Sequence, residues 1–186
     1  LFFESSCLVV GLGNRESTPD SLGPIVLQNL IVTKYLFDQN TITMLDKYRN
    51  VSSFAPNVTG VTGLETIELI ESVITTFHFV IAIDALASSK IENILKVIQI
   101  TDTGIHPGSG VGNNRGELSS NTLGIPVIAV GVPTVIDGVT IVYDTIRYLY
   151  QKISYTKKNF KKEKLSLFSN SHHKYHDELS EDEKSK

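Results

Sequence analysis

His-Phe-Val-Ile-Ala-Ile, at residues 78–83, is a continuous apolar run that is followed directly by Asp84. A short apolar run of this kind is typical of a strand that is buried on both faces of a parallel sheet. Two similar runs, Ser-Cys-Leu-Val-Val-Gly-Leu at 6–12 and Pro-Val-Ile-Ala-Val-Gly-Val at 126–132, predict two more buried strands. Together, the three runs predict a sheet that helices cover on both sides.

The segments between these runs show helical, strand and loop patterns in turn. Apolar residues at helical spacing predict helices at 19–33, 63–75 and 134–151. Apolar, β-branched composition predicts further strands at 41–45 and 91–100. Segments rich in Gly, Ser, Asn or Pro predict loops at 50–62 and 103–120. This alternation predicts an α/β fold, a three-layer αβα sandwich with a mostly parallel sheet.

Length and composition restrict the class of protein. The chain has 186 residues, of which 41% are hydrophobic and 20% charged, which fits about one globular domain and excludes a collagen or a fully disordered chain. Cys7 is the single cysteine, so no disulfide can form within the chain and a reducing compartment is expected. No membrane span and no signal peptide are recognised, so a cytoplasmic location is predicted.

Charge separates the last part of the chain from the rest. Residues 157–186 hold eight lysines and six acidic residues, whereas residues 1–156 carry more acidic than basic residues. We therefore expect an α/β domain over 1–156 and a polar, poorly ordered tail over 157–186. The acidic body would repel phosphates, so nucleic-acid binding is not expected.

Two acidic residues follow predicted strands, where α/β proteins place their ligands. Asp20 lies at the start of the helix predicted after the first strand, and Asp84 ends the run at 78–83. A helix N-terminus favours an ionised Asp20, while apolar surroundings favour a protonated Asp84. Such a pair supplies one base to activate a water and one acid to protonate a leaving amine. The alternatives are structural: Asp20 could cap the helix, and Asp84 could cap a turn at Ser88.

Two glycine-rich loops also follow predicted strands. Gly11-Leu12-Gly13 begins like a dinucleotide-binding fingerprint, but Glu16 occupies the position of the third glycine and disfavours a bound pyrophosphate. The loop at 104–117 contains His106 and Arg115 and could present backbone N–H groups or a guanidinium to an anion. A flexible loop with a structural histidine is the alternative. The spacing of histidines, cysteine and carboxylates in the sequence does not require a metal site. Asp20, Asp84 and His106 could nevertheless be proposed as ligands.

Five segments of the sequence resemble the germination protease family of spore-forming bacteria. They are VVGLGNRESTPDSLGP (9–24), APNVTGVTGLET (55–66), AIDALAS (82–88), TGIHPGSGVGNNRGELS (103–119) and GIPVIAVGVPTVID (124–137). The resemblance runs from about residue 7 to about residue 150. It implies a phosphorylase/hydrolase-like α/β fold and an atypical aspartic endopeptidase without a cofactor or metal, in which Asp20 and Asp84 are the functional aspartates.

The resemblance also implies substrates and assembly. The family degrades small acid-soluble spore proteins in the spore core, is made as a zymogen, acts as a homotetramer and cuts after an acidic residue. A basic group must then meet the substrate carboxylate, and Arg15, Lys90 and Arg115, together with His106, are the candidates for substrate binding. Members of the family extend beyond both ends of this chain, which is therefore expected to be a fragment with uncertain activity of its own.

Two other functions remain open from the sequence. The chain is distantly similar to hydrogenase-maturation endopeptidases, in which acids at the places of Asp20 and Asp84, with a histidine, contact nickel. That similarity implies a metal-dependent maturation endopeptidase with Asp20, Asp84 and His106 as ligands. Loss of both ends of the family's sequence also allows a non-catalytic binding domain with the same α/β body.

Overall fold

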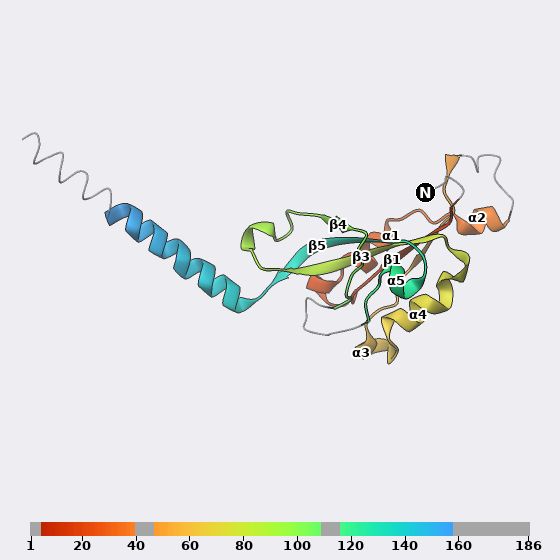
Figure 1. Cartoon of the computed structure of the whole chain (residues 1–186), viewed down its shortest axis with the longest axis horizontal. Coiled ribbons are helices and arrows are strands. Elements are labelled where there is room, and N and C mark those ends of the chain that lie inside the picture. The colour runs from red at the N-terminus through yellow and green to blue at the C-terminus, as the bar shows by residue number, and fades with distance from the viewer. Residues whose placement is uncertain (1–4, 40–46, 109–115, 158–186) are drawn as a thin grey trace, which may run out of the picture. The chain divides into compact units, whose positions relative to one another are not determined.

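The computed structural model describes residues 5–39, 47–108 and 116–157. Contacts divide the chain into two units, Leu1–Asp137 and Gly138–Lys186. The first unit contains a five-stranded sheet with the strand order β2-β1-β3-β5-β4 (Figure 1). Its strands are β1 (Cys7–Gly11), β2 (Val51–Phe54), β3 (Phe79–Ser88), β4 (Gln99–Thr101) and β5 (Val127–Ile136). Only β4 is antiparallel to its neighbour, so the mostly parallel α/β sheet is confirmed.

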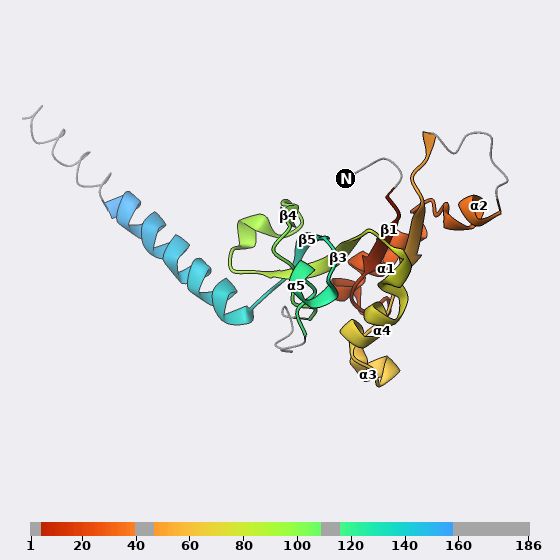
Figure 2. The ribbon, with the colours of Figure 1, turned by 45° about the vertical axis from the view of Figure 1, so that its right-hand side comes forward.

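Helices cover both faces of this sheet, which confirms the expected sandwich. The helices of the first unit are α1 (Leu22–Gln28), α2 (Lys34–Asp38), α3 (Thr59–Thr62), α4 (Thr66–Val73) and α5 (Ser120–Leu123). Single 3₁₀ turns are η1 (Thr18–Asp20), η3 (Ile74–Thr76) and η4 (Ile91–Asn93). Figure 2 shows α3 leading into α4 beside the sheet.

Two apolar clusters hold the layers together. Leu8, Val10, Val80 and Ala82 pack on the face that Ile70 of α4 covers. The side chains of Cys7, Val9 and Phe79 point to the opposite face, where Leu27 of α1 and Leu30 pack against them. Successive residues of a strand point to opposite faces, so one run of consecutive apolar residues serves both clusters. This is why β1 and β3 have no polar alternation.

Several predicted boundaries are wrong for identifiable reasons. The loop predicted at 50–62 contains β2 and α3, because pairing with β1 fixes Val51–Phe54 as an edge strand despite its two serines. The strand predicted at 91–100 is reduced to β4, since its apolar residues are largely exposed; Ile98 has 68% and Ile100 70% of its surface exposed. The strand predicted at 41–45 lies outside the described residues.

The two helices expected beside the candidate site are also displaced. The helix predicted over 19–33 is shorter, with η1 first and then α1, which ends at Gln28. The helix predicted over 134–151 runs from 138 to 157 instead, because pairing with the long strand β3 extends β5 to Ile136. That helix, drawn in cyan and blue in Figure 1, belongs to the second unit. The polar tail predicted from 157 falls, from 158 onward, outside the described residues.

Among the described residues, no helix combines the length and the apolar composition needed to cross a membrane.

Candidate functional site

A tight loop after β1 fixes the position of Asp20. The carboxylate of Asp20 accepts a hydrogen bond from the Asn14 backbone N–H at 2.9 Å, and the Asp20 carbonyl oxygen accepts from the same group at 3.1 Å. Gly13 has a φ of +102°, a backbone conformation that favours glycine, and a Cβ there would lie 3.0 Å from Asp20 Oδ1. The glycine therefore lets the loop close directly against the carboxylate.

Two further glycines bring α1 onto the strands. A Cβ on Gly11 would lie 2.6 Å from the backbone of Gly23, and a Cβ on Gly23 would lie 2.6 Å from the carbonyl oxygen of Ile83. Both distances are shorter than real Cβ atoms tolerate, so the first turn of α1 packs backbone to backbone against β1 and β3. The turn η1, which carries Asp20, is placed at the same edge because it directly precedes this helix.

A long-range hydrogen bond ties the Asp20 turn to the other side of the sheet. Thr134 of β5 donates its hydroxyl to the carbonyl oxygen of Pro19 at 2.5 Å, although 115 residues separate them. Residues of η1 also contact both β3 and β5. The Asp20 turn therefore lies against β3 and β5, and the bond to Thr134 places it at the carboxyl-terminal half of β5.

Asp84 lies inside β3, at a position where β3 is paired with β5 and just past the end of β1. It has only 3% of its surface exposed and is paired in register with Gly131 of β5. Strand alternation puts Asp84 on the same face as Val80 and Ala82. Its carboxylate accepts a hydrogen bond from the Ala85 backbone N–H at 2.9 Å.

The structure corrects one expectation about Asp84 and disfavours both capping roles. β3 does not end at Asp84 but continues to Ser88, because β5 pairs with it that far. The turn after the strand is held by the hydroxyl of Ser88, which bonds the backbone of Lys90. The N-cap of α1 is Ser21, and the carboxylate of Asp20 bonds backward to Asn14.

Asp20 and Asp84 flank the point at which the strand order reverses. From β1, the chain passes to β2 on one side of the sheet and then to β3 on the other. Gly11, the last residue of β1, is paired with Ile83, so Asp84 is the first residue of β3 beyond the end of β1. Such a switch point is where open α/β sheets bind ligands. The parallel pairing of β1 with β3 agrees with the mostly parallel sheet predicted from the sequence.

Arg15 lines a cavity of about 340 Å³ at the same edge. Other lining residues are Gly13 after β1, Gln28 of α1, Ser53 of β2 and Asn57 beyond it. With its amide oxygen facing the guanidinium, Gln28 accepts hydrogen bonds from Arg15 Nη2 at 3.0 Å and from Nε at 3.2 Å. Of the four candidate substrate-binding residues, Arg15 is also the nearest to Asp20 in the sequence.

His106, Lys90 and Arg115 are placed differently. His106 lines a separate cavity of about 210 Å³, together with Leu86 and Gly131 on the Asp84 face of the sheet. Lys90 is exposed in the turn after β3, and its backbone bonds Ser88. Arg115 lies outside the described residues.

The proposed nickel-type ligand set is not assembled as a cluster. Across 5–39, 47–108 and 116–157, no three His, Cys, Asp or Glu side chains gather closely enough to hold a metal ion. Asp20, Asp84 and His106 therefore do not form a three-ligand site within the described part of the chain.

Some contributors to this edge were missed from the sequence. The sequence predicts a helix at Thr134, whereas the structure places this residue in β5, where it bonds the Asp20 turn. Gln28 and Asn57 were not singled out, although both line the Arg15 cavity. The sequence does favour a turn at Asn57, in the segment Pro-Asn-Val, because Asn tolerates the positive φ of 65° that it adopts there.

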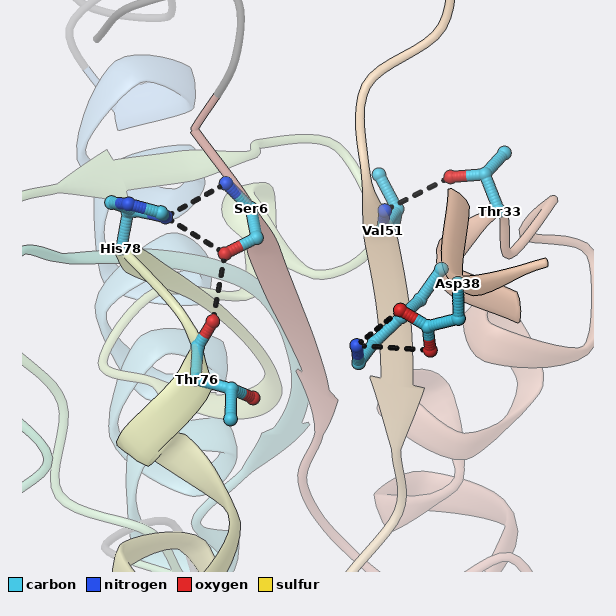
Figure 3. A network of polar contacts seen from close by, with 7 residues as sticks. Ser6, Thr33, Asp38, Val51, Thr76 and His78 are labelled. Atoms are coloured by element: carbon cyan, nitrogen blue, oxygen red, sulfur yellow. Dashed lines mark hydrogen bonds and ion pairs between the residues drawn. The ribbon is translucent and has the colours of Figure 1, made fainter. Parts of the chain in front are cut away.

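The opposite, amino-terminal edge of the same strands holds a second polar network (Figure 3). The Ser6 backbone N–H donates to His78 Nδ1 at 3.0 Å, and the Ser6 hydroxyl lies 2.8 Å from that nitrogen and 3.0 Å from the carbonyl oxygen of Thr76. The backbone N–H of His78 donates in turn to the Ser6 carbonyl oxygen at 3.0 Å. These bonds join the starts of β1 and β3 and account for Ser6 and His78 as structural residues.

Comparison with known proteins identifies relatives. The sequence matches the germination protease family over residues 2–186. It is 58% identical over 129 residues to the germination protease of Bacillus cytotoxicus, 55% to that of Bacillus subtilis and 59% to that of Bacillus licheniformis. Each alignment covers 68% of this chain and 35% of the relative, so the chain spans about a third of the length of these proteins.

Proposed function

Because the chain belongs to the germination protease family, we propose that it carries the catalytic centre of an endopeptidase that uses Asp20 and Asp84. The observation that supports this most is the position of both acids at the strand-order reversal between β1 and β3. Asp20 arrives there on a turn held by Gly13 and Thr134, and Asp84 is held by the sheet itself. Two carboxyl groups reach this edge from different elements, which allows different environments for them.

In the proposed reaction, the two carboxyl groups open onto one cleft and divide the proton transfers between them. One carboxylate accepts a proton from a water molecule as the water attacks the peptide carbonyl carbon. The other carboxyl group donates its proton to the departing amide nitrogen, so the C–N bond breaks and a neutral amine leaves. The near-complete burial of Asp84 and the partial exposure of Asp20 supply the difference in environment that such a division requires.

The proposed substrates are small acid-soluble spore proteins, which are cleaved after an acidic residue in the spore core during germination. A zymogen and a homotetramer are proposed for the whole protein. These finer statements rest on the five motifs that this chain has in common with the germination protease family.

Replacing each aspartate by asparagine tests the catalytic pair. Asparagine keeps the size of the side chain and one accepting oxygen, but it cannot transfer the proton. Asp20→Asn and Asp84→Asn should each lower the cleavage rate of a purified small acid-soluble spore protein by about 10²–10⁴-fold, measured by mass spectrometry of the products. The double variant should be hardly slower than either single variant, because the two acids act as a unit.

Asp38→Asn is the matched control, because Asp38 lies on α2 and pairs with Lys34 at the surface. It should keep the full cleavage rate. Normal cleavage by Asp84→Asn would contradict the aspartate mechanism. Cleavage that stops with a chelator would favour the metal-dependent alternative, and a folded chain that cleaves nothing would favour the binding domain.

A further inference from the structure

Strand β4 (Gln99–Thr101) forms one open edge of the sheet. Within the described residues it pairs with β5 alone, so its other side has no neighbouring strand (Figure 1). An edge of this kind offers a row of backbone N–H and C=O groups to another strand. Proline or lysine often protects such edges, but residues 97–101, Val-Ile-Gln-Ile-Thr, contain neither proline nor a charged residue. The edge is therefore open to pairing.

The apolar side chains at this edge are exposed rather than packed. Ile98 has 68% and Ile100 70% of its surface exposed. Strand alternation puts both isoleucines on one face, whereas Gln99 and Thr101 point to the other face, where they line the cavity beside His106. Large apolar side chains on an open edge indicate an interaction surface.

The segment over 96–102 reads Lys-Val-Ile-Gln-Ile-Thr-Asp and is complementary to its own reverse. In an antiparallel pairing of two copies centred on Gln99, Lys96 of each copy lies opposite the partner's Asp102. Within the described residues, neither of these two side chains forms an ion pair inside its own chain. The two pairs of opposite charge that result favour this register over its neighbours, because opposite charges directly across two strands attract each other.

The residues between the two charges match in the same register. Ile98 lies opposite the partner's Ile100, so four isoleucines from the two copies gather on one face. On the other face, Gln99 lies opposite the partner's Gln99, and Thr101 lies opposite the partner's Val97. Direct cross-strand neighbours have Cβ atoms about 4.5–5.5 Å apart. Such a pairing covers the exposed isoleucines and extends the wall of the cavity that Gln99 and Thr101 line.

We propose that β4 pairs with β4 of a second copy of this chain, antiparallel and centred on Gln99, so that the two sheets join across a two-fold axis. A two-fold contact needs a surface that matches itself, and the charge pattern over 96–102 meets this condition. The proposed homotetramer specifies no contact surface, and β4 supplies one that does not depend on the aspartate mechanism. The partner's Gln99 and the partner's Val97 then contribute to the cavity beside His106.

A cysteine at the two-fold axis tests the register. In Gln99→Cys the two introduced thiols lie opposite each other, so oxidation with copper–phenanthroline should join two full chains by a disulfide, seen as a dimer on a non-reducing gel. Ser53→Cys is the matched control, because Ser53 is also exposed but lies on β2, the strand at the other edge of the sheet. It should remain almost wholly monomeric on the gel, as should the wild-type chain, whose single cysteine is buried.

Charge reversal tests the contact between Lys96 and Asp102. Lys96→Asp places two acids opposite each other and should weaken the self-association measured by sedimentation equilibrium by about 10-fold. The double variant Lys96→Asp, Asp102→Lys should restore the wild-type association, because it exchanges the two charges and keeps the pairs. Ile100→Lys should leave the chain monomeric where the wild type associates. Unchanged melting temperatures of the monomers would show that these surface changes leave the fold intact.

A wild-type chain that stays monomeric at every concentration, or a double variant as weak as Lys96→Asp alone, would overturn the pairing. Equal cross-linking of Gln99→Cys and Ser53→Cys would do the same. Self-association without a cross-link in Gln99→Cys would contradict the β4 contact and leave the proposed homotetramer standing. A Gln99→Cys chain that cross-links, from a protein that cleaves no spore protein, would instead contradict only the proposed protease activity.

Discussion

The two ends of β1 and β3 place polar residues for different purposes. At the amino-terminal edge, Ser6 and His78 bond each other and the backbone of Thr76, so the polar groups hold two strands in register (Figure 3). At the carboxyl-terminal edge, Asp20 and Arg15 come from a loop that borders a cavity. Both edges use long-range hydrogen bonds, and at the carboxyl-terminal edge Arg15 also lines a cavity of about 340 Å³.

The comparison shows that one pair of strands can carry stabilising polar groups at one end and the residues of a candidate site at the other. At the start of a strand, some backbone N–H and C=O groups have no partner in the neighbouring strand. A side chain that hydrogen-bonds to this backbone supplies the missing partner. A polar group on a loop beyond a strand end can face a substrate, because the loop turns away from the sheet. Changes at the two edges should therefore affect different measurements.

The largest expected effect comes from breaking the glycine contact that builds the carboxyl-terminal edge. Gly23→Ala should lower the free energy of unfolding by about 3 kcal/mol, because the added Cβ would meet the backbone of Leu12 and Ile83 and push α1 off the strands. Urea denaturation measures the loss. Gly60→Ala on α3 is the control, since a Cβ there meets nothing within 4 Å, and it should change stability by less than about 1 kcal/mol. Equal effects of the two variants would contradict this account of the edge.

Cys7, at the amino-terminal start of β1, gives a pH-dependent effect of intermediate size. Burial raises the pKa of the Cys7 thiol from 9.0 to about 11, with Arg49 opposing the shift. The folded chain thus keeps this proton between the two values, while the unfolded chain loses it. The stabilisation is complete below about pH 9 and is lost as the pH rises toward 11, by roughly 2 kcal/mol relative to Cys7→Ala.

Denaturation at pH 8, 9, 10 and 11 for both chains measures this difference. Rapid alkylation of Cys7 by iodoacetamide at pH 8 would contradict a buried, protonated thiol.

The smallest expected effect separates the two edges most cleanly. Thr134→Val removes the hydrogen bond to Pro19, and His78→Ala removes the imidazole bonds to Ser6 but keeps the backbone bond; each should cost about 1 kcal/mol of stability. Only Thr134→Val should also slow cleavage, by several-fold, because it loosens the turn that carries Asp20. The check is to compare melting temperature with cleavage rate for both variants. A slower rate in His78→Ala at unchanged substrate affinity would mean that the two edges are coupled.

The sequence predicted the central strands and the sheet edge at which the candidate site lies. It did not predict all of the residues that line the site. β1, β3 and β5 are apolar on both faces, and this burial leaves a clear pattern in 6–12, 78–83 and 126–132. Edge strand β2 carries two serines and is fixed by pairing with β1, a long-range effect that its own composition does not reveal. For the same reason the extension of β3 beyond Asp84 escaped prediction, since β5 imposes it.

The Arg15 cavity shows the same limit at the level of side chains. Arg15 could be named as a candidate from its place after a predicted strand. Its neighbours Gln28 and Asn57 could not, because α1 and the segment after β2 bring them together only in the folded chain. Local pattern located the residues that follow strands, whereas packing between elements decided which of them share a cavity.

The parallel register of β1 and β3 also sets when Asp20 and Asp84, the proposed catalytic pair, can be brought together. Cys7 is paired with Phe79, so 72 residues of chain must be made and looped back before the two strands can join. During synthesis, Asp20 leaves the ribosome long before Asp84, and the turn that carries Asp20 gains its tie to Thr134 later still. Under the proposed function, the two acids could act as a pair only after nearly the whole sheet has assembled.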